Sequence, residues 1–336
     1  MTSEEWEGAA APGEVLVGVA GCGVCHTDLG FLYEGVPTRH PFPLVLGHEI
    51  SGVVVEAGRG AEEWVGRPVV VPAVIPCGDC AACREGLGSI CARQIFPGND
   101  VDGGFATHVR LPARGLCAVP DLKDRRVNPR GLELASLAVI ADAVSTPYQA
   151  ILRSGLGRGD LAVFVGVGGV GGFGVQIAAA LGALVAAIDV SEERLALMSR
   201  HGAGLVLNAD RIEFKELRGS VAAFARRHDI PTWRQRIFET SGTPQGQATA
   251  FGLLGPGGYL SVVGFTPRKI EVRLSNLMAL DATTRGNWGC LPSTIPPCST
   301  SSCRDRWRSS RSSSGGPCPP SMRLSRRSTS ARRRAA

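Results

Sequence analysis

Residues 161–188 contain no charged side chain, and seven glycines lie among them, most densely at 166–174. The stretch is long enough to cross a bilayer. However, a membrane helix should be most regular at its centre, where this stretch has most of its glycines. A buried strand (161–165), a glycine turn and a buried helix (169–182) account better for the pattern. The sequence therefore predicts a strand–turn–helix unit rather than a membrane span.

Strand-like and helix-like segments alternate on both sides of this unit. A helical region at 133–153 precedes it. The strands expected after it lie at 184–189, near 204–207, at 236–240 and at 258–264, separated by helices at 192–201, 212–227 and 245–254, with a last apolar run near 283–290. Such alternation is typical of a parallel, doubly wound sheet.

The first part of the chain has a different pattern. Residues 15–20, 44–56 and 69–75 read as short strands, joined by turns rich in Gly and Pro. A chain of 336 residues is long enough for two domains. The predicted fold class is α/β, with a β-rich domain at 1–140 followed by a Rossmann domain at 141–292.

The glycine turn has the spacing of a dinucleotide-binding loop. Gly166, Gly168 and Gly171 form G-x-G-x-x-G, and Gly169 and Val170 lie inside the motif. Glycines at this spacing let the backbone approach a pyrophosphate at the N-terminus of a helix. Because the motif lies between a predicted strand and a predicted helix, it predicts a nicotinamide dinucleotide as cofactor.

An acidic residue in the next strand indicates which dinucleotide is bound. Asp189 ends that predicted strand, 18 residues after Gly171. A carboxylate there binds the ribose hydroxyls and repels a 2′-phosphate, which favours NAD over NADP. Arg194, on the following helix, could instead pair with such a phosphate.

Four cysteines lie in a polar loop that has no hydrophobic period of its own. Cys77, Cys80, Cys83 and Cys91 form C-x2-C-x2-C-x7-C within residues 76–100. A closed tetrahedral zinc site replaces the missing core of such a loop. An iron–sulfur cluster is the chemical alternative, because it also takes four thiolates.

A second set of possible metal ligands lies closer to the N-terminus. Cys25 follows the first predicted strand in the sequence Gly-Cys-Gly-Val-Cys-His-Thr-Asp (21–28), and His48 lies 23 residues later in Gly-His-Glu (47–49). Together with the four-cysteine loop, these motifs resemble the zinc-containing alcohol dehydrogenases of the medium-chain dehydrogenase/reductase superfamily. The resemblance covers residues 12–292.

The resemblance implies a GroES-like catalytic domain, NAD, and two zinc ions per chain. Cys25 and His48 match ligands of the catalytic zinc. The third ligand would be Asp142, where many relatives have Cys, so this set departs from the family pattern. Three protein ligands leave a fourth position open for a substrate oxygen.

The resemblance also suggests roles for neighbouring side chains. Thr27 matches the hydroxyl that takes the substrate proton, and Glu49 matches a residue that approaches the zinc transiently. Asp28 is expected to orient His48. His26 is a candidate for the next step of the proton relay, but it could instead contact the cofactor pyrophosphate or simply lie exposed.

Five segments resemble one family more closely, the 6-hydroxycyclohex-1-ene-1-carbonyl-CoA dehydrogenases of anaerobic benzoyl-CoA degradation. They lie at 22–31, 97–106, 112–117, 141–150 and 286–292. This resemblance implies an acyl-CoA ester as small-molecule substrate and a role in aromatic compound catabolism. The alternative is a zinc dehydrogenase for an alcohol, polyol or aromatic alcohol without CoA. We also expect a homo-oligomer.

The last 44 residues have a different composition from the rest. The formal net charge is +6, but residues 293–336 contain ten Arg, 13 Ser and one acidic residue, so residues 1–292 carry 26 basic against 29 acidic residues. A disordered basic tail and a nucleic-acid-binding arm are two interpretations. We expect no nucleic-acid partner; salt-dependent DNA binding by this segment would indicate otherwise.

A shifted reading frame is the third and favoured interpretation of these residues. If the frame moves back by one base, residues 293–303 become compatible with Glu-Tyr-Tyr-Pro-Ala-Val-Leu-Asp-Leu-Val-Leu. Several later Ser codons also become apolar, and an amphipathic helical pattern appears. The sequence therefore predicts an altered frame near Pro292 and a disordered segment after it.

Cysteine usage bears on the compartment. Eleven cysteines occur without a recognisable signal peptide, because Glu4, Glu5 and Glu7 lie where such a peptide carries positive charge. Reduced thiols and metal sites are therefore expected rather than a disulfide framework. This reading predicts a cytoplasmic enzyme with no membrane association.

Overall fold

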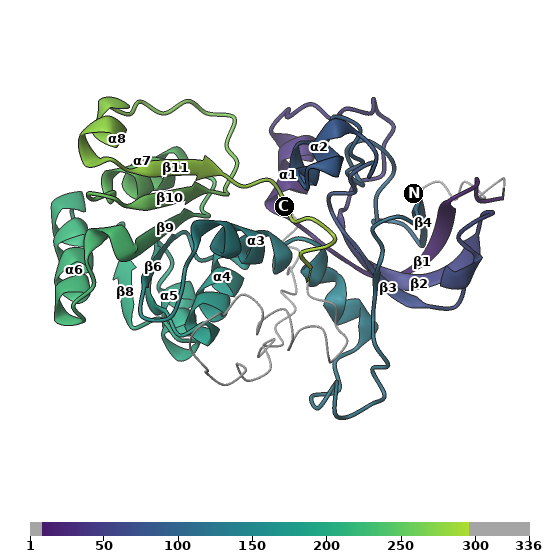
Figure 1. Cartoon of the computed structure of the whole chain (residues 1–336), viewed down its shortest axis with the longest axis horizontal. Helices are drawn as coiled ribbons and strands as arrows, with labels where there is room; N and C mark the ends of the chain where they lie inside the picture. The colour runs from purple at the N-terminus through teal and green to yellow at the C-terminus, as the bar shows by residue number, and fades with distance from the viewer. Residues whose placement is uncertain (1–8, 296–336) are drawn as a thin grey trace, which may run out of the picture.

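The computed structural model describes residues 9–295, which form two domains lying side by side (Figure 1). One domain is built on a five-stranded sheet and the other on a six-stranded sheet. Most of the segment for which the sequence predicts a shifted frame, residues 296–336, lies outside the described residues.

The six-stranded sheet belongs to the second domain, and its strands pair in parallel. Their order is β11-β10-β9-β6-β7-β8, the doubly wound arrangement that the alternation of segments predicts. The strands are β6 (Leu161–Val165), β7 (Leu184–Asp189), β8 (Leu205–Asn208), β9 (Gln235–Glu239), β10 (Tyr259–Val262) and β11 (Thr283–Gly286). The strand order reverses between β6 and β9, where sheets of this type bind ligands.

Helices cover both faces of this sheet, which explains why β6 and residues 184–188 of β7 are apolar without interruption. Leu161, Val163 and Val165 of β6 pack in one cluster with α6 and α7, while Ala162 and Phe164 pack on the other face with α3, α4 and α5. The helices are α3 (Ser145–Ser154), α4 (Gly169–Ala180), α5 (Glu192–Arg200), α6 (Phe214–Arg227), α7 (Pro244–Gly252) and α8 (Ser275–Leu280).

Two of these helices begin at side-chain caps. The Ser191 hydroxyl accepts from the Arg194 N–H at the start of α5, and the Thr243 hydroxyl accepts from the Gly246 N–H at the start of α7. Pro244 occupies the first position of α7, where its missing N–H costs no hydrogen bond. These local signals explain why both helices begin close to the predicted residues.

The five-stranded antiparallel sheet of the first domain has the order β4-β1-β2-β3-β5. Its strands are β1 (Glu14–Gly23), β2 (Glu49–Ala57), β3 (Pro68–Val71), β4 (His108–Pro112) and β5 (Cys117–Ala118). Val15, Val17, Ile50, Val54 and Val69 are fully buried between them. The helices of this domain are α1 (His26–Tyr33) and α2 (Ala81–Arg84), with 3-10 turns at η1 (Glu62–Trp64) and η2 (Gly88–Ile90).

The two domains are joined at two places. The helical region expected at 133–153 is divided at Asp142 into the 3-10 helix η3 (Leu134–Ala141), which packs on β1 and β2, and α3 of the second domain. After β11 the chain returns to the first domain, where Leu291 lies against Gly88 and Pro292 against Gly115. This returning segment runs between the domains in Figure 1.

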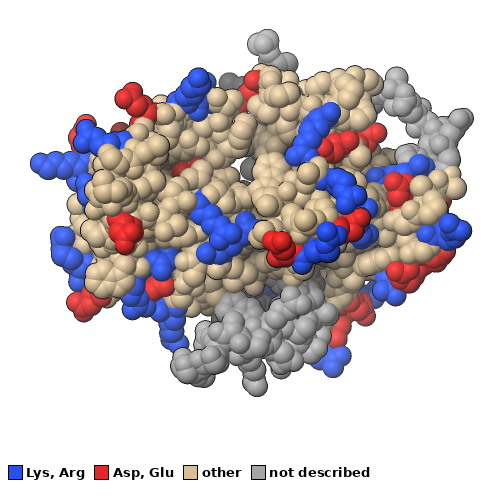
Figure 2. Space-filling view, turned by 45° about the horizontal axis from the view of Figure 1, so that its top comes forward, with Lys and Arg blue, Asp and Glu red and all other residues tan. Residues whose placement is uncertain are grey.

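The structure divides the uncharged stretch 161–188 into β6, α4 and β7, as predicted. Among the described residues, no single helix is long and apolar enough to cross a membrane. The bent pair of η3 and α3 would be long and apolar enough only if its two helices were counted together. On the face shown in Figure 2, Lys and Arg side chains are interspersed with Asp and Glu.

Several elements were not expected from the sequence. The strand expected at 44–56 begins at Glu49, and α1, β4, β5, α8 and the 3-10 helix η4 (Thr232–Arg234) lie outside the predicted segments. β4 and β5 are short edge strands that depend on pairing with β1 and β3. Their local sequences carry too few residues to show a period of two.

Candidate active site

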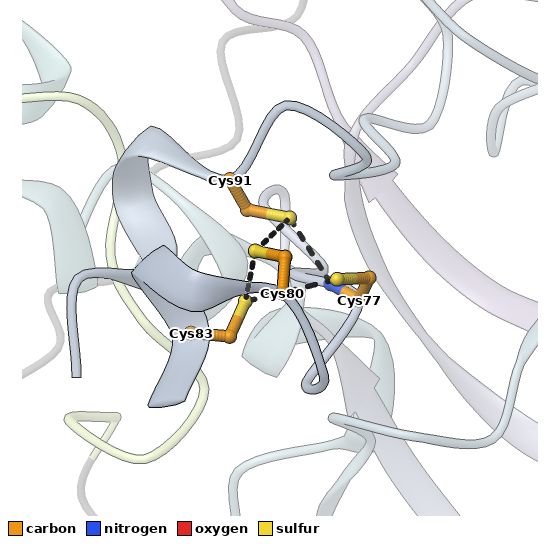
Figure 3. A group of neighbouring side chains, drawn as sticks. All are labelled: Cys77, Cys80, Cys83 and Cys91. Carbon is orange, nitrogen blue, oxygen red and sulfur yellow. Dashed lines mark hydrogen bonds between the residues drawn. The ribbon is translucent and has the colours of Figure 1, made fainter. Parts of the chain in front are cut away.

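The four cysteines of the polar loop converge on one point (Figure 3). Their sulfur atoms lie within 4.8 Å of one another, with Sγ–Sγ distances of 3.4 Å for Cys80–Cys83, 3.8 Å for Cys80–Cys91 and 3.9 Å for Cys77–Cys83. All four are free thiols. A tetrahedron with zinc–sulfur bonds of about 2.3 Å has edges of about 3.8 Å, so the four sulfurs fit one zinc ion.

This geometry distinguishes between the two metal groups that the sequence allows. An iron–sulfur cluster places several iron atoms between its thiolates and therefore needs sulfurs that are farther apart. Burial opposes ionisation of Cys91, but backbone N–H groups of Cys77 and Arg93 outweigh it and lower the pKa of the Cys91 thiol to about 7. The hydrogen bond with Asp79 and burial raise the pKa of the Cys77 thiol to about 12, so a bound metal ion would have to displace the proton of that ligand.

We expect Cys83→Ser to remove one of two zinc ions per chain and to loosen the loop, because serine is a poor zinc ligand and the loop lacks a core. Metal analysis of the purified variant measures the loss, and Cys117→Ser, a cysteine outside both clusters, serves as the matched control. A Cys83→Ser protein that retains two zinc ions would contradict the four-thiolate site.

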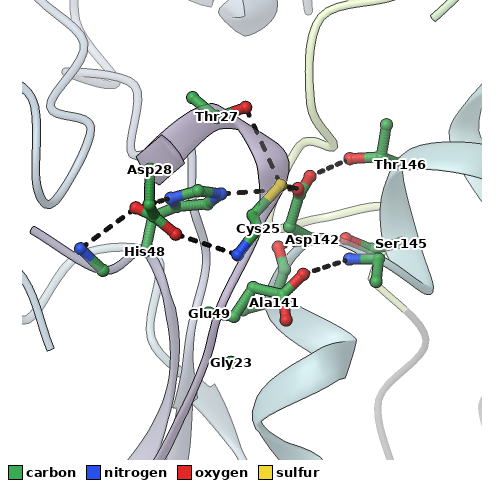
Figure 4. A network of polar contacts seen from close by, with 12 residues as sticks. Gly23, Cys25, Thr27, Asp28, His48, Glu49, Ala141, Asp142, Ser145 and Thr146 are labelled. Atoms are coloured by element: carbon green, nitrogen blue, oxygen red, sulfur yellow. Dashed lines mark hydrogen bonds and ion pairs between the residues drawn. The ribbon is translucent and has the colours of Figure 1, made fainter. Parts of the chain in front are cut away.

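A second cluster forms where the two domains meet (Figure 4). Cys25 caps the N-terminus of α1, His48 precedes β2, and Asp142 lies between η3 and α3. Asp142 Oδ2 lies 3.7 Å from Cys25 Sγ and 3.5 Å from His48 Nε2. One donor atom from each residue lies within 4.8 Å of the others. The fold therefore brings together the three side chains that the sequence analysis selected.

The imidazole of His48 is the best test of whether a metal fits here. It is 1% exposed, and its buried Nε2 has no hydrogen-bond partner among the described residues. Burial alone would lower its pKa, but the carboxylates of Asp142 and Asp28 outweigh burial and raise the pKa of His48 well above its usual value. His48 Nε2, the Cys25 thiol and the Asp142 carboxylate together form a donor set that suits zinc.

The carboxylate of Asp28 accepts hydrogen bonds from residues of this cluster. Its Oδ1 accepts hydrogen bonds from His48 Nδ1 at 3.1 Å and from the Gly47 N–H at 3.2 Å, while Oδ2 accepts from the Cys25 N–H at 2.9 Å. The contact at Nδ1 fixes the tautomer of His48 and directs Nε2 toward Asp142. Asp28 thus lies where the sequence analysis expected it.

Three further candidates lie at different depths around the cluster. The Thr27 hydroxyl accepts from Cys25 Sγ at 3.7 Å. The Glu49 carboxylate is 4% exposed and accepts from the Ala143 N–H at 3.1 Å, and burial together with the Asp142 charge raises its pKa to about 8. The His26 side chain is 73% exposed and lies 3.6 Å from Glu34. Thr27 and Glu49 are therefore adjacent to the cluster, whereas His26 faces solvent.

The glycine loop links β6 to α4 at the point where the strand order reverses. Gly166 has a φ of +87°, and a Cβ there would lie 2.4 Å from the Ser241 backbone. A Cβ on Gly171 would lie 1.9 Å from the Gly166 carbonyl oxygen, whereas one on Gly169 would meet no atom within 4 Å. The first and third motif glycines are thus required by packing, and the N-terminus of α4 is open for a phosphate group.

Asp189 lies at the carboxyl end of β7 beside this loop. Its Oδ2 accepts from the Val167 N–H at 2.7 Å, and its Oδ1 accepts from the N–H groups of Val190 and Ser191, each at 2.9 Å. The exposed Arg194 guanidinium lies 3.7 Å from Oδ1. Asp189 therefore holds the glycine loop as well as offering an acceptor, and Arg194 is the nearby cation that could receive a phosphate.

We expect Asp189→Ala to raise the KM for NAD about tenfold or more and to relax discrimination against NADP, because hydrogen bonds to a carboxylate contribute about 1.5–3 kcal/mol. Kinetics with both cofactors measure this effect. Arg194→Ala is the matched control and should weaken use of NADP more than use of NAD. Unchanged kinetics of Asp189→Ala with both cofactors would reject the ribose role.

The structure adds one buried acid that the sequence analysis did not select. Glu239 ends β9 next to the glycine loop, is fully buried, and accepts at Oε1 from the Ser241 N–H and hydroxyl and from the Gly242 N–H, at 2.6–3.1 Å. Its Oε2 has no hydrogen-bond partner among the described residues. The available signal in the sequence was an acidic residue directly after the apolar pair Ile237 and Phe238. Glu239 fixes the loop that faces Gly166.

A pH dependence of stability follows from this burial. Burial outweighs the Ser241 and Gly242 hydrogen bonds and raises the pKa of Glu239 above its ordinary value of 4.5. Its contribution to stability is therefore complete below about pH 4.5 and is lost as pH rises through the native pKa. Between pH 4.5 and the native pKa of Glu239, the free energy of unfolding should fall by up to about 1.4 kcal/mol per pH unit. We expect Glu239→Gln to remove this fall. Urea unfolding at several pH values tests it, and parallel curves for both proteins would contradict it.

Comparison with known proteins identifies the family of each domain. The alcohol dehydrogenase GroES-like domain family matches residues 11–121, and the zinc-binding dehydrogenase family matches residues 169–301. One alcohol dehydrogenase from Geobacillus stearothermophilus is 34% identical over 266 residues, covering 77% of this chain and 72% of the relative. Another from the same species is 36% identical over 198 residues, covering 58% of this chain and 56% of the relative.

A solved structure shares the architecture of both domains. Galactitol-1-phosphate dehydrogenase from Escherichia coli gives a TM-score of 0.75 at 27% identity, covering 86% of this chain and 80% of that one. The chain belongs to the zinc-containing alcohol dehydrogenases. The family consists of zinc-dependent dehydrogenases that act on CH–OH groups, and similar structures at 25–26% identity were solved with NADH bound or with cobalt and zinc bound. The predicted α/β fold with a GroES-like first domain is confirmed.

Proposed function

We propose that this dehydrogenase oxidises a secondary alcohol at the cluster of Cys25, His48 and Asp142. The convergence of a thiol, a buried imidazole and a carboxylate at the junction of the domains carries the proposal. When bound, zinc supplies a Lewis acid that lowers the pKa of an alcohol hydroxyl, and NAD supplies the hydride acceptor. The four-cysteine cluster would hold a second, structural zinc ion.

The side chains around the cluster would orient and transfer the proton. Thr27 Oγ1, which lies beside Cys25 Sγ, can accept the proton released by the substrate hydroxyl and pass its own toward solvent. We assign the exposed His26 to the solvent end of this relay. Asp28 keeps His48 in position through its hydrogen bond with Nδ1. Glu49 accepts from the Ala143 N–H and so would fix the backbone next to Asp142.

The cofactor would lie along the reversal point of the six-stranded sheet. The backbone at Gly168, Gly169 and Val170 would face the pyrophosphate, with Gly166 and Gly171 shaping the turn. Asp189 would accept from a ribose hydroxyl. This assignment is supported by the open space at Gly169 and by the hydrogen bonds that hold Asp189 at the end of β7.

For the substrate, we propose 6-hydroxycyclohex-1-ene-1-carbonyl-CoA, oxidised to the 6-oxo ester in anaerobic benzoyl-CoA degradation. The support is the resemblance of five segments, which include residues 22–31 at the candidate zinc site and 141–150 around Asp142. The second candidate is an alcohol or polyol without CoA. The structural similarity to galactitol-1-phosphate dehydrogenase favours that alternative.

Spectrophotometric measurement of NADH formation separates the two candidates. The CoA ester is compared with ethanol, benzyl alcohol and threonine at equal concentrations, and we expect a clear preference for the ester. Equal or better turnover of a simple alcohol would reject the CoA substrate while leaving the dehydrogenase activity in place. The assay uses the chain with its reading frame restored after Pro292, and lack of turnover with every alcohol by that chain would reject the proposed activity.

We further propose that the dehydrogenase forms a homo-oligomer through the edge of its six-stranded sheet. All four residues of β11 are exposed, and Leu274 and Met278 beside it are 69% and 78% exposed. Unpaired strand edges flanked by apolar side chains tend to be covered by another chain. Sedimentation velocity tests the proposal, and a monomer at micromolar concentration would reject it.

A further inference from the structure

Three rings lie in series from the candidate zinc site to the surface. The His48 and Phe96 ring centroids are 4.9 Å apart, and those of Phe96 and Trp288 are 5.7 Å apart, with interplanar angles of 41° and 35°. Exposure rises along the series, from 1% for His48 through 6% for Phe96 to 44% for Trp288. The rings thus form a continuous aromatic wall that begins at a candidate zinc ligand.

The wall is assembled from both domains. His48 and Phe96 belong to the first domain, whereas Trp288 follows β11, the edge strand of the second. Trp288 Nε1 donates to Gln94 Oε1 at 2.8 Å, which ties the indole to the loop that carries Phe96. The ring is therefore held in one orientation although nearly half of it is exposed.

The backbone next to Trp288 is connected to the metal cluster. Asn287 Nδ2 donates to the Thr146 carbonyl oxygen at 3.2 Å, and the Thr146 hydroxyl donates to Asp142. Gln149 Nε2 donates to the Trp288 and Gly289 carbonyl oxygens, at 3.3 and 2.9 Å. These contacts fix the distance of the indole from the candidate zinc site, as a substrate-binding wall requires.

We propose that Trp288, packed against the buried Phe96, forms a substrate wall that selects alcohols whose hydroxyl carbon belongs to an unsaturated ring. The inference rests on the proposed function and adds the substrate class. A flat apolar ring can stack on the wall and displace water from it. A polyol would press hydroxyl groups against aromatic faces that offer weak acceptors, and such unpaired groups are costly to bury.

The test uses the chain with its reading frame restored after Pro292 and compares two secondary alcohols that differ mainly in the ring, cyclohex-2-en-1-ol and 2-propanol. We expect Trp288→Ala to lower the ratio of their kcat/KM values about tenfold, because it removes the stacking surface. Trp288→Phe should retain most of the preference. Trp233→Ala, which removes a 63% exposed tryptophan remote from this wall in η4, is the matched control and should leave the ratio unchanged.

Binding of benzamide to the NADH complex, measured by calorimetry, provides a readout that needs no turnover. We expect Trp288→Ala to weaken benzamide binding about tenfold while zinc content and NADH affinity stay unchanged. Two results for Trp288→Ala would contradict the proposed wall. One is an unchanged kcat/KM ratio together with unchanged benzamide affinity, and the other is an equal loss of kcat/KM with both alcohols. If the chain with its reading frame restored after Pro292 turns over no alcohol, the proposed function fails, and benzamide binding alone then decides the wall.

Discussion

Asp142→Ala should lose the catalytic zinc ion and at least about a hundredfold in kcat/KM, while the four-cysteine site keeps its zinc. Asp142 offers the oxygen that lies 3.5 Å from His48 Nε2 and 3.7 Å from Cys25 Sγ, so its removal leaves two ligands. Even losing a residue that only orients a ligand typically costs 10–100-fold in affinity or activity, and a ligand contributes more. Metal analysis and NADH formation measure the two effects, with the substitution made in a chain whose reading frame after Pro292 is restored.

Two further variants make this result specific. Asp142→Cys should retain zinc, because a thiolate is a good zinc ligand and cysteine is the residue that the family resemblance implies there. Asp124→Ala is the matched control, since Asp124 pairs with the exposed Arg126 and lies outside the cluster. An Asp142→Ala protein that contains two zinc ions and retains full activity would show that Asp142 is not a ligand.

Restoring the reading frame after Pro292 should convert a chain with little or no turnover into an active enzyme. At this point the chain has returned to the first domain, with Leu291 against Gly88 and Pro292 against Gly115. A cavity of about 260 Å³ lies beside them and is lined in part by Pro76, Leu291 and Ser293. The Ser- and Arg-rich residues that follow supply too little apolar surface to offset the entropy of ordering them.

Three proteins tested together decide the reading-frame prediction: the printed chain, the frame-restored chain and a chain that ends at Ile295. We expect all three to bind NADH, because the six-stranded sheet is complete before residue 287. We expect only the restored chain to show high activity and a sharp melting transition, since a cleft loose by about 1 Å can cost about a hundredfold in rate. Full activity and a sharp transition in the printed chain would refute the altered frame.

Much of the second domain could be predicted because its signals are local. The apolar run of β6, the glycines after it and the acid at the end of β7 lie within 29 residues. They belong to one strand–turn–helix–strand unit, so the sequence shows them together. Buried parallel strands need apolar residues on both faces. Leu161 and Ala162 therefore pack in different hydrophobic clusters, and the strand shows no alternation of polar and apolar residues. The four-cysteine loop was predictable for a similar reason, because its ligands lie within 15 residues.

Local spacing indicated the four-cysteine site and the cofactor loop, and the family resemblance indicated the set of Cys25, His48 and Asp142. Spacing alone could not place these three side chains together, because they come from two domains and are separated by up to 117 residues. The roles of Glu239 and Trp288 emerged from the fold, because Glu239 lies in a strand paired with β6 and β10, and Trp288 donates to Gln94 of the first domain. The physical reason is that burial, orphaned hydrogen-bonding atoms and ring stacking are properties of neighbours in space, and no local period records them.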